Sequence, residues 1–232
     1  MNEMTMESAM FPACPAKLGL YAIVPNAEWV KRVLEYGVDT VQLRAKSEDT
    51  DYLAQEIEMA VHAVQQIKPE VPLFINDHWQ LALDYGAYGV HLGQEDLEHV
   101  DLEKIRAAGL RLGISTHSVA EMHRAHQLCP SYIAMGAVYP TTAKKIPTAP
   151  LGLERLKEFA YLMSDYPLVA IGGVNISNAA DVLKCGVGSI AVMGAIIDAL
   201  DPAQAVLDLK AVVMETVSAS SAPCVLSLAR SR

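Results

Sequence analysis

The stretch TVQLRAKSEDTDYLAQEIEMAVHAVQQIKPEVPLFIND, residues 40–77, decides the fold class of this chain. It opens with a short apolar run, Thr40–Leu43, which fits a buried strand. In Asp51–Ile67 apolar residues return every three or four positions, which predicts an amphipathic helix, and a second apolar run follows at Pro72–Ile75. A buried strand, a helix and another buried strand are typical of a parallel sheet.

The same alternation continues along most of the chain. Further strands are expected at Leu18–Val24, Gly89–Leu92, Arg111–Ile114, Ser131–Met135, Leu168–Ile171 and Ser189–Met193. Further helices are expected at Ala27–Tyr36, His78–Tyr85, Leu102–Ala108, Ser118–Leu128, Gly152–Leu162, Ile176–Cys185 and near Ala195–Leu200. About eight such units close a barrel, so the sequence predicts an α/β protein with a single-domain (β/α)8 TIM barrel. A doubly wound open sheet is the alternative architecture.

The repeat sets the expected domain limits. Residues 1–17 form an N-terminal extension, residues 18–213 the barrel, and residues 214–232 a C-terminal tail or extra terminal element. A chain of 232 residues suits one barrel, because barrels of this class run to about 200–250 residues. Aromatic residues make up only 6% of the chain, which predicts an aliphatic core.

Composition restricts the partners and the compartment. The formal net charge of −9 argues against nucleic acid as a partner, and no apolar run approaches the ~20 residues that span a bilayer. Four cysteines without C-x-x-C spacing fit a reducing compartment, and the acidic, Pro-interrupted N-terminus is unlike a signal peptide. A cytoplasmic protein with small-molecule substrates is expected, and the oligomeric state, a homo-oligomer included, stays open.

Basic side chains follow the second predicted strand. Gln42 and Arg44 alternate with Leu43, so both should point to one face of the sheet while Leu43 packs on the other. Arg44 offers a planar fork that suits phosphate, and Lys46 adds a mobile positive charge. A solvated strand end is the alternative interpretation, and the same alternative applies to Lys144 on a Thr-rich loop.

Two carboxylates follow the next two strands. Asp77 and Asp96 should meet on one rim of the barrel, and Mg²⁺ is usually held by one or two carboxylates together with substrate phosphates. The sequence therefore predicts a magnesium–diphosphate site. For Asp77 the alternative is a helix N-cap.

Glycines end the last two strands. Gly172-Gly173 and Gly194 stand where barrels often bind a phosphate with backbone N–H groups, although tight turns also need glycine. A metal-bound diphosphate and a separate monophosphate suggest transfer between two phosphorylated substrates. His117, after the fifth strand, is either a general base or a structural hydrogen-bonding group.

Six segments together resemble the thiamine-phosphate synthase family over roughly residues 18–200. They are QLRAK (42–46), Asn76-Asp77, HLGQED (91–96), Ser115-Thr116-His117, residues 140–144 and IGG (171–173). The resemblance implies a transferase of thiamine biosynthesis that joins hydroxymethylpyrimidine diphosphate to a phosphorylated thiazole (or its carboxylate form) through a pyrimidinylmethyl cation. It implies Mg²⁺ as cofactor.

The resemblance also implies roles for individual residues. Arg44, Lys46, Lys144 and Ser115 would be catalytic, and Asp77 and Asp96 would bind Mg²⁺. The substrates would be held by Gln42, Leu43, Arg44, Ala45, Lys46, Asn76, Ser115, Thr141, Thr142, Ala143, Lys144, Gly173, Met193 and Gly194.

Three positions depart from the family pattern. Pro25 stands where an acidic residue is common, Ala143 replaces a threonine, and Gly194 replaces a serine. Loss of two hydroxyl groups predicts weaker binding of the thiazole phosphate. The rival interpretations are a thiazole tautomerase that uses His117, a catalytically weakened phosphate-ligand binder, and a generic phosphate-binding barrel.

Overall fold

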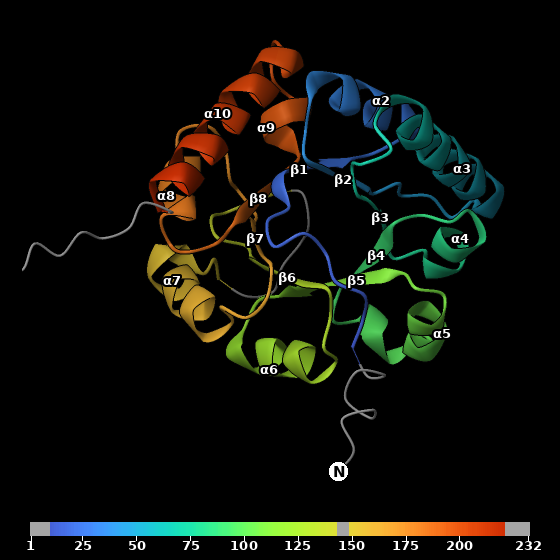
Figure 1. Cartoon of the computed structure of the whole chain (residues 1–232), viewed down its shortest axis with the longest axis horizontal. Coiled ribbons are helices and arrows are strands. Elements are labelled where there is room, and N and C mark those ends of the chain that lie inside the picture. The colour runs from blue at the N-terminus through green and yellow to red at the C-terminus, as the bar shows by residue number, and fades with distance from the viewer. Residues whose placement is uncertain (1–9, 143–148, 221–232) are drawn as a thin grey trace, which may run out of the picture.

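The eight predicted strands close into a barrel in the computed structural model, which describes residues 10–142 and 149–220 (Figure 1). Every strand pairs in parallel with the next one along the chain, and β1 closes the ring by pairing with β8. The strands are β1 (Gly19–Val24), β2 (Thr40–Leu43), β3 (Leu73–Asn76), β4 (Gly89–Leu92), β5 (Arg111–Thr116), β6 (Tyr132–Gly136), β7 (Leu168–Ile171) and β8 (Ser189–Val192). The predicted barrel is confirmed, and the open sheet is wrong.

Helices surround the barrel. They are α2 (Ala27–Tyr36), α3 (Thr50–Ile67), α4 (Trp79–Asp84), the 3₁₀ turn η1 (Asp96–Glu98), α5 (Leu102–Ala107), α6 (Val119–Gln127), α7 (Gly152–Leu162), α8 (Ala179–Leu183), α9 (Gly194–Ile197) and α10 (Pro202–Ser220). Side-chain caps explain where several of these helices begin. Asp49 accepts hydrogen bonds from the first turn of α3, and Asn26 and Ser118 cap α2 and α6 in the same way.

The core has two layers of different composition. The layer between strands and helices is aliphatic, as predicted. The interior of the barrel instead holds the rings of Tyr21, Phe74 and Tyr132, with centroids 5.0–6.0 Å apart. The prediction of a wholly aliphatic core is therefore wrong for this layer. Space for the rings comes from glycine, since a Cβ at Gly113 would overlap the Tyr132 ring.

The N-terminal segment crosses one end of the barrel before it enters β1 (Figure 1). Phe11 is buried in the outer core, and Cys14 packs against the aromatic interior. The described part of the predicted N-terminal extension is therefore a cover for the end of the barrel opposite the strands' carboxyl ends.

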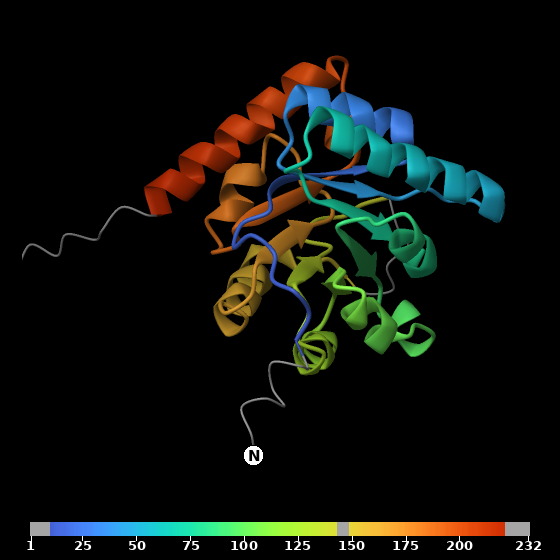
Figure 2. The ribbon, with the colours of Figure 1, turned by 45° about the vertical axis from the view of Figure 1, so that its right-hand side comes forward.

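The C-terminal helix α10 lies against α2, α8 and α9 (Figure 2). It continues to Ser220, past the boundary predicted at residue 213. Val206, Leu209 and Val213 are buried at helical spacing, which explains why the helix stays docked on the barrel.

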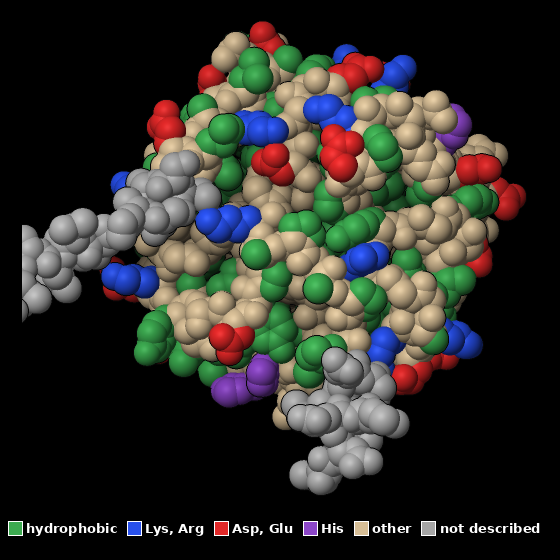
Figure 3. Space-filling model, in the orientation of Figure 1, with side chains coloured by type: hydrophobic (Ala, Val, Ile, Leu, Met, Phe, Trp, Pro, Cys, Tyr) green, Lys and Arg blue, Asp and Glu red, His purple; other side chains and the backbone are tan. Residues whose placement is uncertain are grey.

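The visible surface carries mixed charges. Lys and Arg side chains are scattered among Asp and Glu on the face shown in Figure 3. None of the described helices is long and apolar enough to span a membrane.

Candidate active site

A cavity of about 450 Å³ opens at the carboxyl ends of the strands, where barrel enzymes place their active sites. Side chains or backbone from every strand end reach it. The predicted site residues that line it are Gln42, Arg44, Asn76, Asp77, Ser115, Thr141, Gly173, Met193 and Gly194.

The end of β2 divides its side chains between the cavity and the outer core. Gln42 and Arg44 face the cavity, whereas Leu43 is buried in the core between barrel and helices, as the alternation predicted. Ala45 is buried in the same core, and the Lys46 side chain is exposed to solvent. The side chains of Leu43, Ala45 and Lys46 are therefore not brought to the cavity, and a contact with substrate through them stays a prediction.

Asp77 follows β3 in a backbone conformation that side chains seldom adopt. Its φ angle is +63°, and its N–H donates to the carbonyl oxygen of His91 at 3.1 Å. The N-cap residue of α4 is His78 rather than Asp77. The capping alternative for Asp77 is therefore wrong, and its side chain lines the cavity. Left-handed backbone at a cavity wall is typical of functional positions.

Asp96 has a structural task in its own loop. Its Oδ2 atom accepts a hydrogen bond from the N–H of Gly93 at 2.8 Å and thereby ties the loop after β4 to the start of η1. Asp96 is not among the described residues that line the cavity, whereas its neighbour Glu95 is. Among the described residues, the carboxylates that line the cavity are thus those of Asp77 and Glu95.

This donor set fits a cation with few protein ligands. Within the described residues no three His, Cys, Asp or Glu side chains gather as a metal cage. One or two carboxylates with the amide of Asn76 nearby suit Mg²⁺, whose remaining ligands are commonly phosphate oxygens and water.

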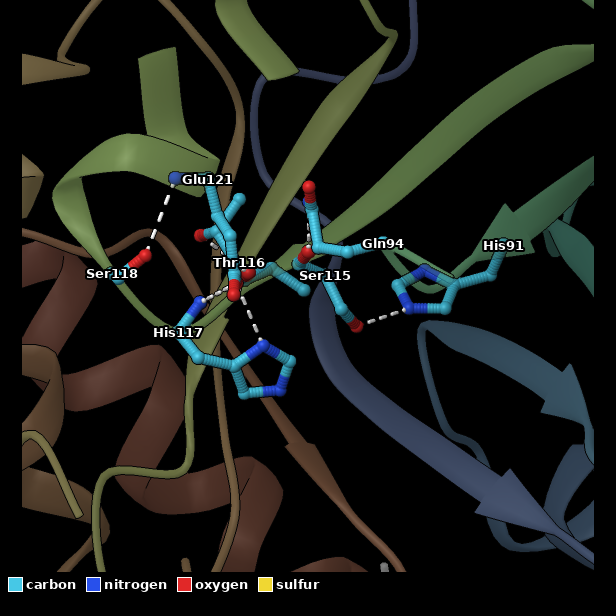
Figure 4. A network of polar contacts seen from close by, with 8 residues as sticks. His91, Gln94, Ser115, Thr116, His117, Ser118 and Glu121 are labelled. Atoms are coloured by element: carbon cyan, nitrogen blue, oxygen red, sulfur yellow. Dashed lines mark hydrogen bonds and ion pairs between the residues drawn. The ribbon is translucent and has the colours of Figure 1, made fainter. Parts of the chain in front are cut away.

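Ser115, at the end of β5, is held by the neighbouring strand (Figure 4). The His91 Nε2 atom lies 2.7 Å from the Ser115 hydroxyl, and the Gln94 side chain donates to the Ser115 carbonyl oxygen at 2.8 Å. Both contacts fix the position of the serine on the cavity wall.

His117 is ordered by the following helix (Figure 4). Its Nδ1 atom lies 2.9 Å from Oε2 of Glu121, and the same oxygen accepts the His117 N–H at 2.7 Å. His117 thus makes structural hydrogen bonds and also borders the cavity, so both interpretations of this histidine stay predictions.

The end of β7 forms a glycine turn against the loop after β6. Gly172 and Gly173 have φ angles of +93° and +69°, and a Cβ on Gly173 would lie 2.6 Å from that of Tyr139. Only glycine therefore fits at residue 173. Backbone can approach a ligand closely here, as a phosphate site requires.

The loop after β6 is described only in part. Thr141 lines the cavity, and Thr142 is exposed to solvent. The predicted site residues Ala143 and Lys144 lie outside the described residues. Met193 and Gly194, which follow β8, line the cavity where α9 begins.

Comparisons with known proteins agree on the family. The profile described as thiamine monophosphate synthase matches residues 20–196. The chain belongs to this family. It is 52% identical to the thiamine-phosphate synthase of Neisseria meningitidis serogroup B over 83% of this chain and 93% of that protein. It is 51% identical to the thiamine-phosphate synthase of Serratia proteamaculans over 85% and 92% of the two chains.

A solved structure of a related protein supports the same family. The thiamine phosphate pyrophosphorylase of Pyrococcus furiosus superposes with a TM-score of 0.76 at 32% identity, covering 87% of this chain and 98% of that one. The expected thiamine monophosphate synthase family is therefore confirmed, and with it the transferase activity of thiamine biosynthesis.

Several residues that shape this thiamine monophosphate synthase site were not predicted. Glu95 and His91 line the cavity, and Tyr21 and Tyr132 lie beneath it, joined to His91 by hydrogen bonds. The period-two alternation of β1, β4 and β6 could have pointed these side chains inward. Asn178, which binds the glycine turn, lies outside any motif and carried no signal in the sequence.

Proposed function

We propose that this cavity joins hydroxymethylpyrimidine diphosphate to the thiazole phosphate and releases diphosphate. The observation that carries the proposal is the lining of a single cavity. Gln42, Arg44 and Asp77 lie on one part of its wall, and the glycine turn at residues 172–173 lies on another. A diphosphate site and a separate monophosphate site within one cavity of about 450 Å³ suit the joining of two phosphorylated rings.

The chemistry needs charge stabilisation rather than proton transfer. The C–O bond between the pyrimidinylmethyl carbon and diphosphate breaks, and its electron pair leaves with the diphosphate. The ring amino group stabilises the resulting cation by resonance, and the thiazole nitrogen then forms the new C–N bond. The protein must therefore align both rings and stabilise the departing anion. We assign this role to Arg44 and Ser115, which line the cavity, and from the sequence to Lys144.

The carboxylate side of the cavity suits a magnesium ion. Asp77 would hold it, with Glu95 or Asp96 and the diphosphate oxygens as further ligands. When bound, Mg²⁺ neutralises charge on the leaving diphosphate. Arg44 reaches the same cavity and offers two parallel N–H donors to the phosphate oxygens.

Two rival functions share this fold. A thiazole tautomerase would use His117 as its base, and the contact with Glu121 orients that histidine. A tautomerase handles no diphosphate, however, so it gives no reason for Arg44 and Asp77 on the cavity wall. A catalytically weakened binder would keep the ligands and lose turnover.

Product formation tests the proposal. Thiamine phosphate is measured from both substrates, with and without Mg²⁺, for the wild type, Asp77→Ala and Asp84→Ala, a control at the exposed end of α4. We expect metal-dependent product that is lost in Asp77→Ala and retained in Asp84→Ala. A folded wild type that makes no product, yet isomerises the thiazole or only binds the ligands, would favour a rival.

A further inference from the structure

A chain of hydrogen-bonding side chains crosses the barrel beneath the cavity. The Gln42 Nε2 atom donates to the Tyr21 hydroxyl at 3.2 Å, and the hydroxyls of Tyr21 and Tyr132 lie 2.9 Å apart. His91 continues the chain, with Nδ1 2.7 Å from the Tyr132 hydroxyl and Nε2 2.7 Å from the Ser115 hydroxyl. Both ends of the chain, Gln42 and Ser115, line the cavity.

The middle of this hydrogen-bonded chain is buried, although His91 also borders the cavity. Tyr21, Tyr132 and His91 are only 1%, 0% and 5% exposed. Burial raises the pKa of both phenols above the ordinary range, so each keeps its single hydrogen. Because each phenol has one hydrogen to donate, the direction of one hydrogen bond fixes the direction of the next.

The amide N–H of Gln42 sets the direction in which these side chains donate their hydrogen bonds. An amide nitrogen can only donate, so Tyr21 accepts from Gln42 and has its own hydrogen to give to Tyr132. Tyr132 then gives its hydrogen to Nδ1 of His91, which leaves the imidazole hydrogen on Nε2. The imidazole therefore donates to the Ser115 oxygen.

The opposite direction is disfavoured. If Nδ1 of His91 donated to Tyr132, Tyr132 would donate to Tyr21. Tyr21 would then accept twice, and its own hydrogen would have no acceptor among the hydrogen bonds of the described residues. A buried donor without an acceptor is costly, because it loses its hydrogen bond to water.

We propose that this chain makes Ser115 a hydrogen-bond donor toward the cavity, with Tyr21, Tyr132 and His91 as positioning residues. Since the Ser115 oxygen accepts from His91, the serine hydrogen is directed to a ligand, and an anionic oxygen is the best acceptor. At the other end, the Gln42 amide nitrogen is engaged, so its carbonyl oxygen can accept from an amino group. The identity of the acceptor as the leaving diphosphate rests on the proposed function, but the direction of the chain does not.

The tautomer of His91 tests the direction without any substrate. Nitrogen-15 NMR of histidine-labelled, ligand-free protein distinguishes the two neutral tautomers and the imidazolium, and His91→Gln assigns the signal. We expect a hydrogen on Nε2 and none on Nδ1 in the ligand-free protein. A hydrogen on Nδ1, or an imidazolium, would overturn the proposal. Because no turnover is involved, this outcome is independent of the proposed reaction.

A double-mutant cycle tests the effect on catalysis. We expect Tyr132→Phe to lower kcat roughly tenfold, the scale of one hydrogen bond to a charged oxygen, and to leave the KM for thiazole phosphate unchanged. In a Ser115→Ala background the same change should have little further effect, because the group through which it acts is gone. Additive effects of the two substitutions would contradict the proposal.

Two further variants guard against a purely structural explanation. Tyr88→Phe is the matched control. Tyr88 packs edge-on against Phe74 with a 5.5 Å centroid distance and takes no part in the hydrogen bonds that join Gln42 to Ser115. It should leave kcat and the His91 signal unchanged. If Tyr132→Phe does not fold, Tyr21→Phe breaks the chain one step earlier and should shift the His91 tautomer populations. An unshifted His91 signal in a folded Tyr21→Phe protein would count against the proposal.

Discussion

The Nδ2 atom of Asn178 donates a hydrogen bond to the carbonyl oxygen of Gly173 at 3.0 Å. The Oδ1 atom of the same side chain accepts the N–H of Asn175 at 2.8 Å, so one amide bridges Gly173 and Asn175. In a planar trans peptide the carbonyl and the following N–H point in opposite directions. The N–H of Val174 therefore points away from Asn178, and we expect it to face the cavity that Gly173 and Val174 line.

Loss of this bridge should affect one substrate only. We expect Asn178→Ala to raise the KM for thiazole phosphate by about tenfold, the scale of a lost hydrogen bond to a charged group, with the KM for the pyrimidine diphosphate unchanged. Steady-state kinetics with each substrate varied in turn measures this. Asn26→Ala, which removes the cap of α2 instead, should lower thermal stability without this selectivity. Equal changes in both KM values would show that Asn178 acts on the whole site.

Two substitutions separate the structural role of Asp96 from a role as a metal ligand. Asp96→Asn keeps an oxygen that can accept from the Gly93 N–H but removes the charge, whereas Asp96→Ala removes both. If Asp96 is a metal ligand, Asp96→Asn should raise the Mg²⁺ concentration for half-maximal activity by about tenfold or more, the effect of losing one charged ligand. A titration of activity against Mg²⁺ measures this. A normal Mg²⁺ requirement in Asp96→Asn, with a loss in Asp96→Ala, would assign Asp96 to the loop alone.

The order of strands and helices could be predicted because it depends on local periodicity. Buried parallel strands are apolar throughout, and the helices carry one apolar face, so both patterns are visible in the sequence. The helix α10 was missed, since its exposed side also carries apolar residues such as Leu207 and Met214, and this blurs its pattern. The aromatic interior was missed because composition averages over the whole chain, whereas Tyr21, Phe74 and Tyr132 gather in one layer.

Site residues could be predicted from the sequence where they stand at the carboxyl end of a strand. Gln42, Arg44, Asp77 and Gly173 reach the cavity because the carboxyl ends of parallel strands meet at one rim. The chain through His91 could not be predicted, since it depends on which side chains meet across the barrel.

The half-buried thiol of Cys14, at the end of the barrel that the N-terminal segment covers, should make stability depend on pH. Burial raises the pKa of Cys14 from the ordinary 9.0 to about 12. Between these values the unfolded thiol ionises while the folded one does not, so the stabilisation is complete below 9.0 and is lost as the pH rises toward 12. The wild type should lose up to about 1.4 kcal/mol per pH unit relative to Cys14→Ser in this window. Urea unfolding of both proteins at several alkaline pH values measures the difference, and parallel curves would refute it.

The missing hydroxyl at Gly194 gives the last prediction. A Cβ at residue 194 would lie 2.8 Å from the Oδ2 atom of Asp198, the mobile end of a side chain that can move aside. A side chain is therefore tolerated at this edge of the cavity. We expect Gly194→Ser to lower the KM for thiazole phosphate several-fold, because a hydroxyl that donates to a phosphate contributes about 1.5–3 kcal/mol before the cost of ordering it.

Gly194→Ala is the matched control, since it adds the same Cβ without the hydroxyl. The KM for thiazole phosphate in Gly194→Ala should equal that of the wild type or exceed it, because Asp198 must shift and nothing is gained. Measured side by side, the two variants separate the hydroxyl from the volume of the side chain. If serine and alanine raise or lower the KM equally, residue 194 does not contact the phosphate, and the glycine costs this enzyme no affinity for its thiazole substrate.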